Sequence, residues 1–379
     1  MVDEMRHILA VKLADIGDAI GTLPALRALR ATFPKATIDA LVTPGPAREV
    51  LAHEPAVTRV RTLAKGAFDS PRGFANPRAL ATLAGFAASL RHEQYDAVVF
   101  FHHLTTVAGA AKYRALALAT GATICAGLDN GRGAFLTHRV LDHGFGVKPE
   151  WAYWLEVAGT LGAVSTDPRP TVTPSPEAFM QACALLPEDT PYVVLHPGVG
   201  AFSPARQWPP ARLAAVGVLL AAEGYALVIT GGKDAAAREA SAALRAHLGS
   251  IRVTDLTGAA DIITTAAIYT GAALWIGSDN GMAHLAAATG APSVIVFGPS
   301  NHRAWAPYGA LEWHPTDDPA ALPATARVVV LRDTIACSPC VYTGYTLGRP
   351  QGCPARSCLD AVHAHHVFAL AQQLLIQTE

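Results

Sequence analysis

The sequence predicts an α/β protein made of two Rossmann-like domains that face each other across a cleft. Three observations predict this fold. Strand-length apolar runs alternate with helical segments in both halves of the 379-residue chain, and a proline-rich stretch separates the halves. The composition, 51% hydrophobic and 16% charged, excludes a disordered or fibrous protein. The length is sufficient for two domains that each bury a substantial core.

The first half contains near-continuous apolar runs, which are typical of parallel strands buried on both faces. These runs lie at residues 7–13, 36–42 and 95–101. Helical segments separate them. One covers residues 76–91, where Asn76 can cap the helix and Pro77 can occupy its first turn.

The same alternation begins again in the second half. Strand-like runs lie at residues 192–198, 226–232, 251–258, 273–279 and 292–299. The proline-rich stretch 165–179 has the composition of an interdomain linker. We therefore predict an N-terminal domain over 1–170, a C-terminal domain over 171–345, and a cysteine-rich segment with a final helix over 337–379.

Charge and hydropathy limit the compartment and the partners. The net charge is −1 and there is no long basic run, so the sequence predicts no nucleic-acid partner. The first residues do not form a signal peptide, and the apolar stretches are shorter than the roughly 20 residues that a membrane helix needs. The expectation is a soluble cytoplasmic protein.

The first polar loop of the second half follows the strand-like run 192–198. It contains Gly198 and Gly200, and then Arg206 just before Trp208. One interpretation is a glycine loop whose backbone N–H groups, together with Arg206, contact a phosphate near a helix N-terminus. The alternative is an ordinary helix start, because glycine after a strand is common and Trp208 can be a hydrophobic staple.

The second polar loop contains Gly232 and Asp234, after the run 226–232. Asp234 is either a favourable acid at a helix start or a carboxylate that accepts the hydroxyl groups of a ribose. The glycine spacing is not GxGxxG, so a nicotinamide-dinucleotide fingerprint is absent.

The third polar loop contains Asp279, Asn280 and Gly281, with His284 one helical turn further on. Asp279 could be only an N-cap, and a single helical histidine is more often a packing residue than a ligand. Three polar strand ends in one domain nevertheless indicate a ligand site, because ligands of open α/β sheets bind at the carboxyl ends of the strands.

The corresponding loop of the first half carries Asp18 beside Gly17. Asp18 is either a helix cap or a carboxylate that faces the cleft and acts as a general base. His102 and His103 could line the same space, and because adjacent side chains point in different directions, one of them is expected to matter.

Taken together, these loops resemble the ADP-heptose:lipopolysaccharide heptosyltransferase family, which consists of inverting glycosyltransferases of the GT-B fold. The resemblance is carried by "VKLADIGDAIGTLPALRALR", "HPGVGAFSPARQWPP", "LVITGGKDAAAREA", "LTGAADI" and "IGSDNGMAHLAAATGAPSVIVFGPS". It implies that Asp18 deprotonates the acceptor hydroxyl, Arg206 contacts the donor phosphates and Asp234 binds the adenosine ribose. The donor-sugar and diphosphate motif corresponds to Asp279, Asn280, Gly281 and His284. Two positions depart from the family: arginine stands at 206 in place of lysine, and Asn280 in place of threonine or serine.

The resemblance implies transfer of a sugar, heptose in the family, from an ADP-sugar to a lipopolysaccharide-core, other saccharide or protein acceptor, at the cytoplasmic face of the inner membrane. No cofactor is expected for catalysis, because Arg206 and a helix dipole can neutralise the diphosphate without a divalent metal. Three other interpretations stay open. They are a nucleotide-sugar 2-epimerase-like isomerase, which needs no acceptor, an NAD-dependent oxidoreductase, which the missing GxGxxG disfavours, and a catalytically silent metal-binding interaction protein.

Four cysteines gather near the C-terminus in the pattern C-x2-C-x12-C-x4-C, namely Cys337, Cys340, Cys353 and Cys358. In a reducing compartment such spacing favours a structural thiolate site for zinc or iron, and the alternative is four unligated thiols. Cysteine-rich C-terminal segments recur in the family that the chain resembles, and its protein-modifying, autotransporter heptosyltransferase-like members include an iron-holding cysteine finger. The other two cysteines, Cys125 and Cys183, are expected to be ordinary buried residues.

Overall fold

The computed structural model of the protein describes residues 5–64, 77–188 and 190–377. Contacts within the chain divide it into two compact units. Unit 1 comprises Met1–Pro170 with Gly344–Thr346, and unit 2 comprises Thr171–Thr343 with Leu347–Glu379. Asn76, the expected helix cap, lies outside the described residues.

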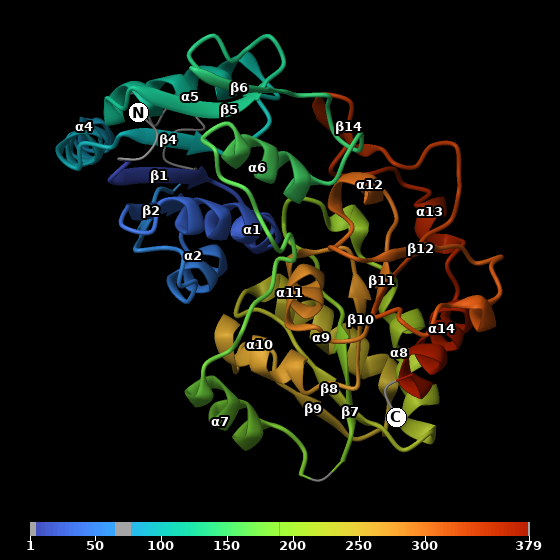
Figure 1. Cartoon of the computed structure of the whole chain (residues 1–379). Coiled ribbons are helices and arrows are strands. Elements are labelled where there is room, and N and C mark those ends of the chain that lie inside the picture. Colours follow the sequence, from blue (N-terminus) through green and yellow to red (C-terminus); the bar gives the residue numbers. More distant parts are fainter. Residues whose placement is uncertain (1–4, 65–76, 189, 378–379) are drawn as a thin grey trace. The chain divides into compact units, whose positions relative to one another are not determined.

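Unit 1 is built on a six-stranded parallel sheet in the order β3-β2-β1-β4-β5-β6 (Figure 1). Its elements are β1 (His7–Lys12), α1 (Ile16–Thr32), β2 (Thr37–Val42), α2 (Pro46–Ala52), β3 (Arg59–Thr62), α4 (Pro77–His92), β4 (Ala97–Phe100), α5 (Val107–Thr120), β5 (Ile124–Asp129), β6 (His138–Leu141) and α6 (Glu150–Gly159). The central strands β1, β2 and β4 are buried almost throughout, as their apolar runs predict.

The strand order of unit 1 reverses between β1 and β4. The chain first proceeds from β1 outward to β3, and then starts again at β4 on the other side of β1. The loops after β1 and β4 therefore leave in opposite directions at the carboxyl edge of the sheet, which is where such folds bind ligands. His102, after β4, accepts a hydrogen bond from the backbone N–H of Leu13, after β1, at 2.7 Å.

Unit 2 contains a seven-stranded parallel sheet in the order β12-β13-β11-β10-β7-β8-β9. Its elements are α7 (Pro176–Leu185), β7 (Tyr192–His196), the 3-10 turn η2 (Pro204–Arg206), α8 (Pro210–Ala222), β8 (Ala226–Ile229), α9 (Ala235–Leu248), β9 (Val253–Asp255), α10 (Ile262–Thr270), β10 (Leu274–Ser278), α11 (Gly281–Thr289), β11 (Ser293–Val296), α12 (His302–Trp305), β12 (Leu311–Trp313), the 3-10 turn η3 (Pro319–Ala321), β13 (Val328–Leu331), the hairpin strands β14 (Val341–Thr343) and β15 (Thr346–Gly348), of which Thr346 is assigned to unit 1, and then α13 (Ser357–Asp360) and α14 (Ala364–Ile376). In the part of the chain that the structure describes, no helix combines the length and the hydropathy needed to span a bilayer.

The strand order of unit 2 reverses between β7 and β10, where the two strands pair directly. Gly277 makes this pairing possible, because an added Cβ would lie 2.8 Å from the backbone oxygen of His196 and 2.6 Å from the ring of Trp275. The loops that follow β7 and β10 are the two that carry the predicted glycine and acid–amide motifs. The fold therefore brings these loops together at the carboxyl edge.

The linker predicted over 165–179 ends earlier than its composition suggests. Pro176 begins α7, and the Ser175 side chain caps that helix by accepting from the Ala178 N–H at 3.3 Å. Proline is favourable at the first helical position, since its missing N–H has no intrahelical partner there. A run of prolines therefore contained both a linker and a helix start.

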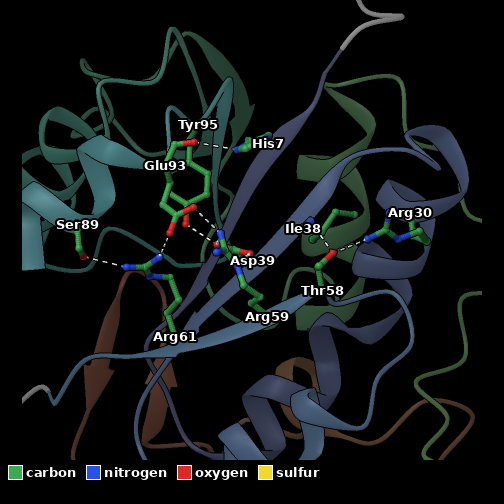
Figure 2. Close-up of polar contacts among 10 residues, drawn as sticks. All are labelled: His7, Arg30, Ile38, Asp39, Thr58, Arg59, Arg61, Ser89, Glu93 and Tyr95. Atoms are coloured by element: carbon green, nitrogen blue, oxygen red, sulfur yellow. Dashed lines mark hydrogen bonds and ion pairs between the residues drawn. The ribbon is translucent and has the colours of Figure 1, made fainter.

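A polar network at the opposite, amino-terminal edge of the first sheet is shown in Figure 2. The fully buried Asp39 of β2 pairs with Arg59 of β3 at 2.8 Å and accepts a hydrogen bond from the Tyr95 hydroxyl at 2.6 Å. Glu93 bonds both Arg59 and Arg61, at 2.6 and 2.7 Å. Because each carboxylate is matched by a guanidinium, the network ties β2, β3 and the segment before β4 together.

Candidate active site

The glycine loop after β7 lies close to the guanidinium of Arg206. An added Cβ at Gly200 would be 3.9 Å from Nη2 of Arg206, and one at Gly198 would be 3.9 Å from Nε2 of His196. Neither contact is tight, so packing alone does not require glycine at these positions. Bare backbone beside a guanidinium is a suitable surface for a phosphate, because amide N–H groups and Arg206 can both donate to it.

Arg206 forms an ion pair with Asp279, with 3.4 Å between Nη1 and Oδ2. Both side chains are largely buried, with exposed fractions of 12% for Arg206 and 3% for Asp279. The pair crosses the switch point, since Arg206 belongs to the β7 loop and Asp279 to the β10 loop. The carboxylate therefore fixes the direction of a guanidinium that retains further N–H donors.

Asn280, and not Asp279, caps the helix α11. Its side-chain oxygen accepts from the N–H groups of Met282 and Ala283 at 2.7 and 3.0 Å, while its amide donates to the Gly198 carbonyl at 2.8 Å. The alternative in which Asp279 is the N-cap is therefore wrong. Gly281 is the first residue of α11, so its N–H belongs to the positive end of the helix dipole.

His284 lies one turn into α11 and is half-buried. Its ring meets the ring of Trp305 edge to face, with 6.4 Å between the centroids. The histidine thus belongs to the helix whose N-terminus faces the glycine loop.

Asp234 follows β8, the strand next to β7, and is exposed. Its Oδ1 caps α9 by accepting from the Ala237 N–H at 2.9 Å. An added Cβ at Gly232 would come within 3.0 Å of its Oδ2. The carboxylate is a cap, and its second oxygen is available at the same sheet edge as the glycine loop.

His196, the last residue of β7, is buried next to the glycine loop. Its Nδ1 and the Thr230 hydroxyl lie 3.0 Å apart, and that hydroxyl is 2.9 Å from the hydroxyl of Tyr269. Burial lowers the pKa of His196 to about 4, against a smaller opposing effect of a hydrogen bond with Thr230. A neutral imidazole adds no positive charge, so the cationic character of this loop comes from Arg206.

In unit 1, Asp18 is the third residue of α1, whose N-cap is Asp15. The interpretation of Asp18 as a cap is therefore wrong. Its carboxylate lies 3.0 Å from Nζ of Lys12, the last residue of β1, and its side chain is 24% exposed. The Lys12 ammonium also lies 4.2 Å from the centroid of the Trp154 ring. Lys12 is only 4% exposed, so the pair holds a partly accessible carboxylate in one position.

Lys12 was not identified from the sequence, although a signal was present. A lysine inside a buried apolar run requires a partner, because an isolated ammonium is costly to bury. The run 7–13 is such a segment, and the structure shows that Asp18 pairs with Lys12.

The two adjacent histidines have different roles, as their opposite directions predict. His102 stacks on Tyr113, with 4.7 Å between the ring centroids, and bonds the β1 loop. His103 lies between Asp142 and Glu150, at 2.9 and 3.0 Å. Burial opposes its charged form, but attraction to Glu150 and hydrogen bonds to both carboxylates raise the pKa of His103 to about 9. His103 therefore serves as a buried structural cation that joins the loops after β4 and β6 to α6.

All four clustered cysteines, Cys337, Cys340, Cys353 and Cys358, line one cavity of about 510 Å³. Burial, together with the other three thiols, raises the pKa of Cys358 to about 11. Among the residues that the structure describes, no three histidine, cysteine or acidic side chains stand close enough to hold a metal ion. The four thiols therefore line the same cavity, but they do not lie at metal-ligand distances from a common point. Of the remaining cysteines, Cys125 is buried as expected, whereas Cys183 is exposed, contrary to expectation.

Two Rossmann-like parallel sheets, each with polar loops at its switch point, are the architecture of the GT-B glycosyltransferases. Residues 83–321 match the model of glycosyltransferase family 9 (heptosyltransferase), and the chain belongs to this family. It is therefore a glycosyltransferase of the heptosyltransferase type, which sets aside the isomerase, the oxidoreductase and the silent-binder interpretations.

Three proteins illustrate the similarity. Lipopolysaccharide heptosyltransferase 1 of Pseudomonas aeruginosa is 28% identical over 337 residues, covering 86% of this chain and 88% of that protein. The structure of Escherichia coli ADP-heptose LPS heptosyltransferase II superposes with a TM-score of 0.70 at 20% identity, over 98% of this chain and 99% of that one. The iron-containing glycosyltransferase TibC of enterotoxigenic E. coli superposes with a TM-score of 0.56 at 14% identity, over 100% of this chain and 78% of that one.

Proposed function

We propose that the enzyme transfers heptose from ADP-heptose to a hydroxyl group of a lipopolysaccharide-core, other saccharide or protein acceptor, with inversion at the anomeric carbon. Unit 2 binds the donor and unit 1 supplies the base. The observation that carries the proposal is the convergence of Gly198, Gly200, Arg206 and Asp279 at one switch point. The names of the relatives support heptose as the sugar and ADP as the carrier. With such an acceptor, the enzyme would work in the cytoplasm, at the inner membrane.

In this mechanism the bond between the anomeric carbon and the phosphate oxygen breaks, and its electron pair leaves with ADP. The acceptor oxygen attacks the opposite face of the same carbon, which inverts it. Charge therefore grows on the diphosphate in the transition state. The Arg206 fork, the bare amides of the glycine loop and the N-terminus of α11 all donate toward negative charge, so they stabilise the leaving group without a metal.

The acceptor hydroxyl must lose a proton as it attacks, and we assign that proton to Asp18. Asp18 is partly exposed and is held by an ion pair, so an acceptor hydroxyl can reach its carboxylate, as a general base requires. Lys12 orients Asp18 from the buried side, which leaves the accessible side for the acceptor.

We propose that the carboxylate of Asp234 binds the ribose hydroxyl groups of the ADP moiety. Asp234→Ser keeps a side-chain oxygen for capping α9 but removes the carboxylate, so the melting temperature should stay near that of the wild type. The dissociation constant for ADP should rise about 10- to 100-fold, the effect of one charge-assisted hydrogen bond. Isothermal titration with ADP and with 2′-deoxy-ADP measures it, and the variant should no longer distinguish the two nucleotides.

Asp261→Ser is the matched control, because Asp261 caps α10 in the same way, accepting from Thr264 at 2.8 Å. It should leave ADP binding unchanged. If Asp234→Ser binds ADP as tightly as the wild type does, Asp234 acts only as a cap.

We also propose that the four cysteines of the 337–358 segment hold one structural zinc or iron ion. A four-thiolate donor set suits both metals, and all four cysteines line one cavity, which supports a shared site. Because TibC, which has a similar fold, contains iron, iron should be tested as well as zinc. The metal would stabilise the segment and take no part in the transfer.

Protein purified without added metal should contain about one equivalent of metal by mass spectrometry, and Cys337→Ser/Cys340→Ser should lose it together with some thermal stability. The pair Cys125→Ser/Cys183→Ser, outside the segment, should retain the metal. Wild-type protein with no metal and four titratable thiols in this segment would contradict the proposal.

A further inference from the structure

The cysteine-rich segment packs directly on the turn that carries Arg206. The fully buried Ser203 donates a hydrogen bond from its hydroxyl to the Pro350 carbonyl at 2.6 Å. Two residues further along, Gly352 lies against Ala205 so closely that an added Cβ would be 2.5 Å from the Ala205 Cβ. Gly352 also has a φ of +68°, so glycine is favoured there on two grounds.

The same serine contacts Arg206 through its backbone. The Ser203 carbonyl accepts from the Arg206 backbone N–H at 3.2 Å and from its Nε at 3.4 Å. The guanidinium is thus held between the Ser203 carbonyl on one side and the Asp279 carboxylate on the other. A continuous chain of hydrogen bonds runs from Pro350 through Ser203 and Arg206 to Asp279.

The other end of the turn is attached to the same part of the chain. The indole of Trp208 donates to the Val362 carbonyl at 3.0 Å, and its backbone N–H donates to the Ser278 hydroxyl at 2.9 Å. The turn itself, η2, is only three residues long, and such short 3-10 turns have little stability of their own. Its conformation therefore depends on these attachments.

We propose that Ser203 is a positioning residue for Arg206: through its hydrogen bond to Pro350 it couples the cysteine-rich segment to the affinity for the donor diphosphate. The proposal rests on the proposed function, since it requires that Arg206 contact the diphosphate. When the Pro350 bond is absent, the turn loosens and the guanidinium must be ordered at the moment of binding. That ordering weakens affinity without removing any group that touches the donor.

The first test is the affinity of Ser203→Ala for ADP, measured by isothermal titration on the full chain. The dissociation constant should rise about 5- to 30-fold, the range for one lost buried hydrogen bond and the disorder that follows. Ser203→Thr, which keeps the hydroxyl, should bind as the wild type does. The matched control is Ser293→Ala, because Ser293 is equally buried and donates to a backbone carbonyl, that of Ala291, at 2.9 Å. That control should lower the melting temperature while its ADP affinity stays unchanged.

The second test is a double-mutant cycle with Arg206→Ala. If Ser203 acts through Arg206, Ser203→Ala should have no further effect on ADP affinity once Arg206 is gone. Fully multiplicative losses, or an unchanged affinity in Ser203→Ala alone, would overturn the proposal. If Arg206→Ala by itself leaves ADP binding intact, the assigned donor site fails and the positioning role fails with it. Should Ser203→Ala not fold, Ser203→Cys replaces it, since the thiol keeps the size but donates weakly.

Discussion

Replacing Asp18 with asparagine should lower the rate of sugar transfer by about 10²- to 10⁴-fold, the usual contribution of a general base. The amide has nearly the same shape but cannot take the proton from the acceptor. Affinity for ADP should not change, because the donor residues all belong to unit 2. The measurement is the initial rate of ADP release with ADP-heptose and a heptose-deficient lipopolysaccharide core, alongside a titration with ADP.

The structure also predicts a stability cost for this change, which separates from its effect on catalysis. Asp18→Asn would remove the carboxylate that lies 3.0 Å from the buried ammonium of Lys12, at a cost of about 1–3 kcal/mol. Lys12→Met/Asp18→Asn should recover part of that stability and none of the activity. Asp15→Asn, the same chemical change at the N-cap of α1, should retain transfer. A near wild-type rate in Asp18→Asn would show that the carboxylate is not the base.

Removing the guanidinium of Arg206 should weaken ADP binding by about 10- to 100-fold, since hydrogen bonds between charged groups contribute about 1.5–3 kcal/mol. Transfer should fall further than binding, because the lost donors act most strongly on the charge that develops on the leaving diphosphate. Arg206→Lys should be intermediate, as lysine retains the charge but not the planar fork. Titration with ADP, and the rate at saturating donor, measure the two effects separately.

The loss of Arg206 also leaves the carboxylate of Asp279 buried and unpaired, so Arg206→Ala/Asp279→Asn is needed to distinguish a binding effect from destabilisation. Arg245→Ala is the matched control, because Arg245 pairs with Asp255 at 3.5 Å elsewhere in unit 2. It should bind ADP normally. An unchanged dissociation constant in Arg206→Ala would remove this residue from the phosphate site.

Much of the architecture could be predicted from local patterns. The apolar runs at 7–13 and 192–198 became β1 and β7, because a strand buried on both faces must be apolar along its whole length. The runs were longer than the strands, since their last residues belong to the loops that carry the polar motifs. Edge strands such as β3 and β6 were missed, because their half-exposed residues lack a continuous apolar signal.

The polar loops themselves could also be recognised in the sequence, because glycine, acidic and amide residues follow the apolar strands. The residues that these loop side chains contact could not be predicted. Which of Asp279 and Asn280 caps α11, and that Asp279 pairs with Arg206, depends on how the β7 and β10 loops meet across 73 residues of sequence. The spacing of residues within one loop does not predict a contact between two distant loops.

The same physical reason explains the remaining differences. Ser203 and Pro350 are 147 residues apart and form their bond only because the cysteine-rich segment folds back onto the η2 turn. Lys12 could be recognised as a buried charge in need of a partner, but only packing selected Asp18 and placed Trp154 beside it. Period and composition are properties of neighbouring residues and determine which elements form. The pairing of side chains from distant elements is decided by the packing of the whole unit, and in this protein those pairings orient the proposed site residues Asp18 and Arg206.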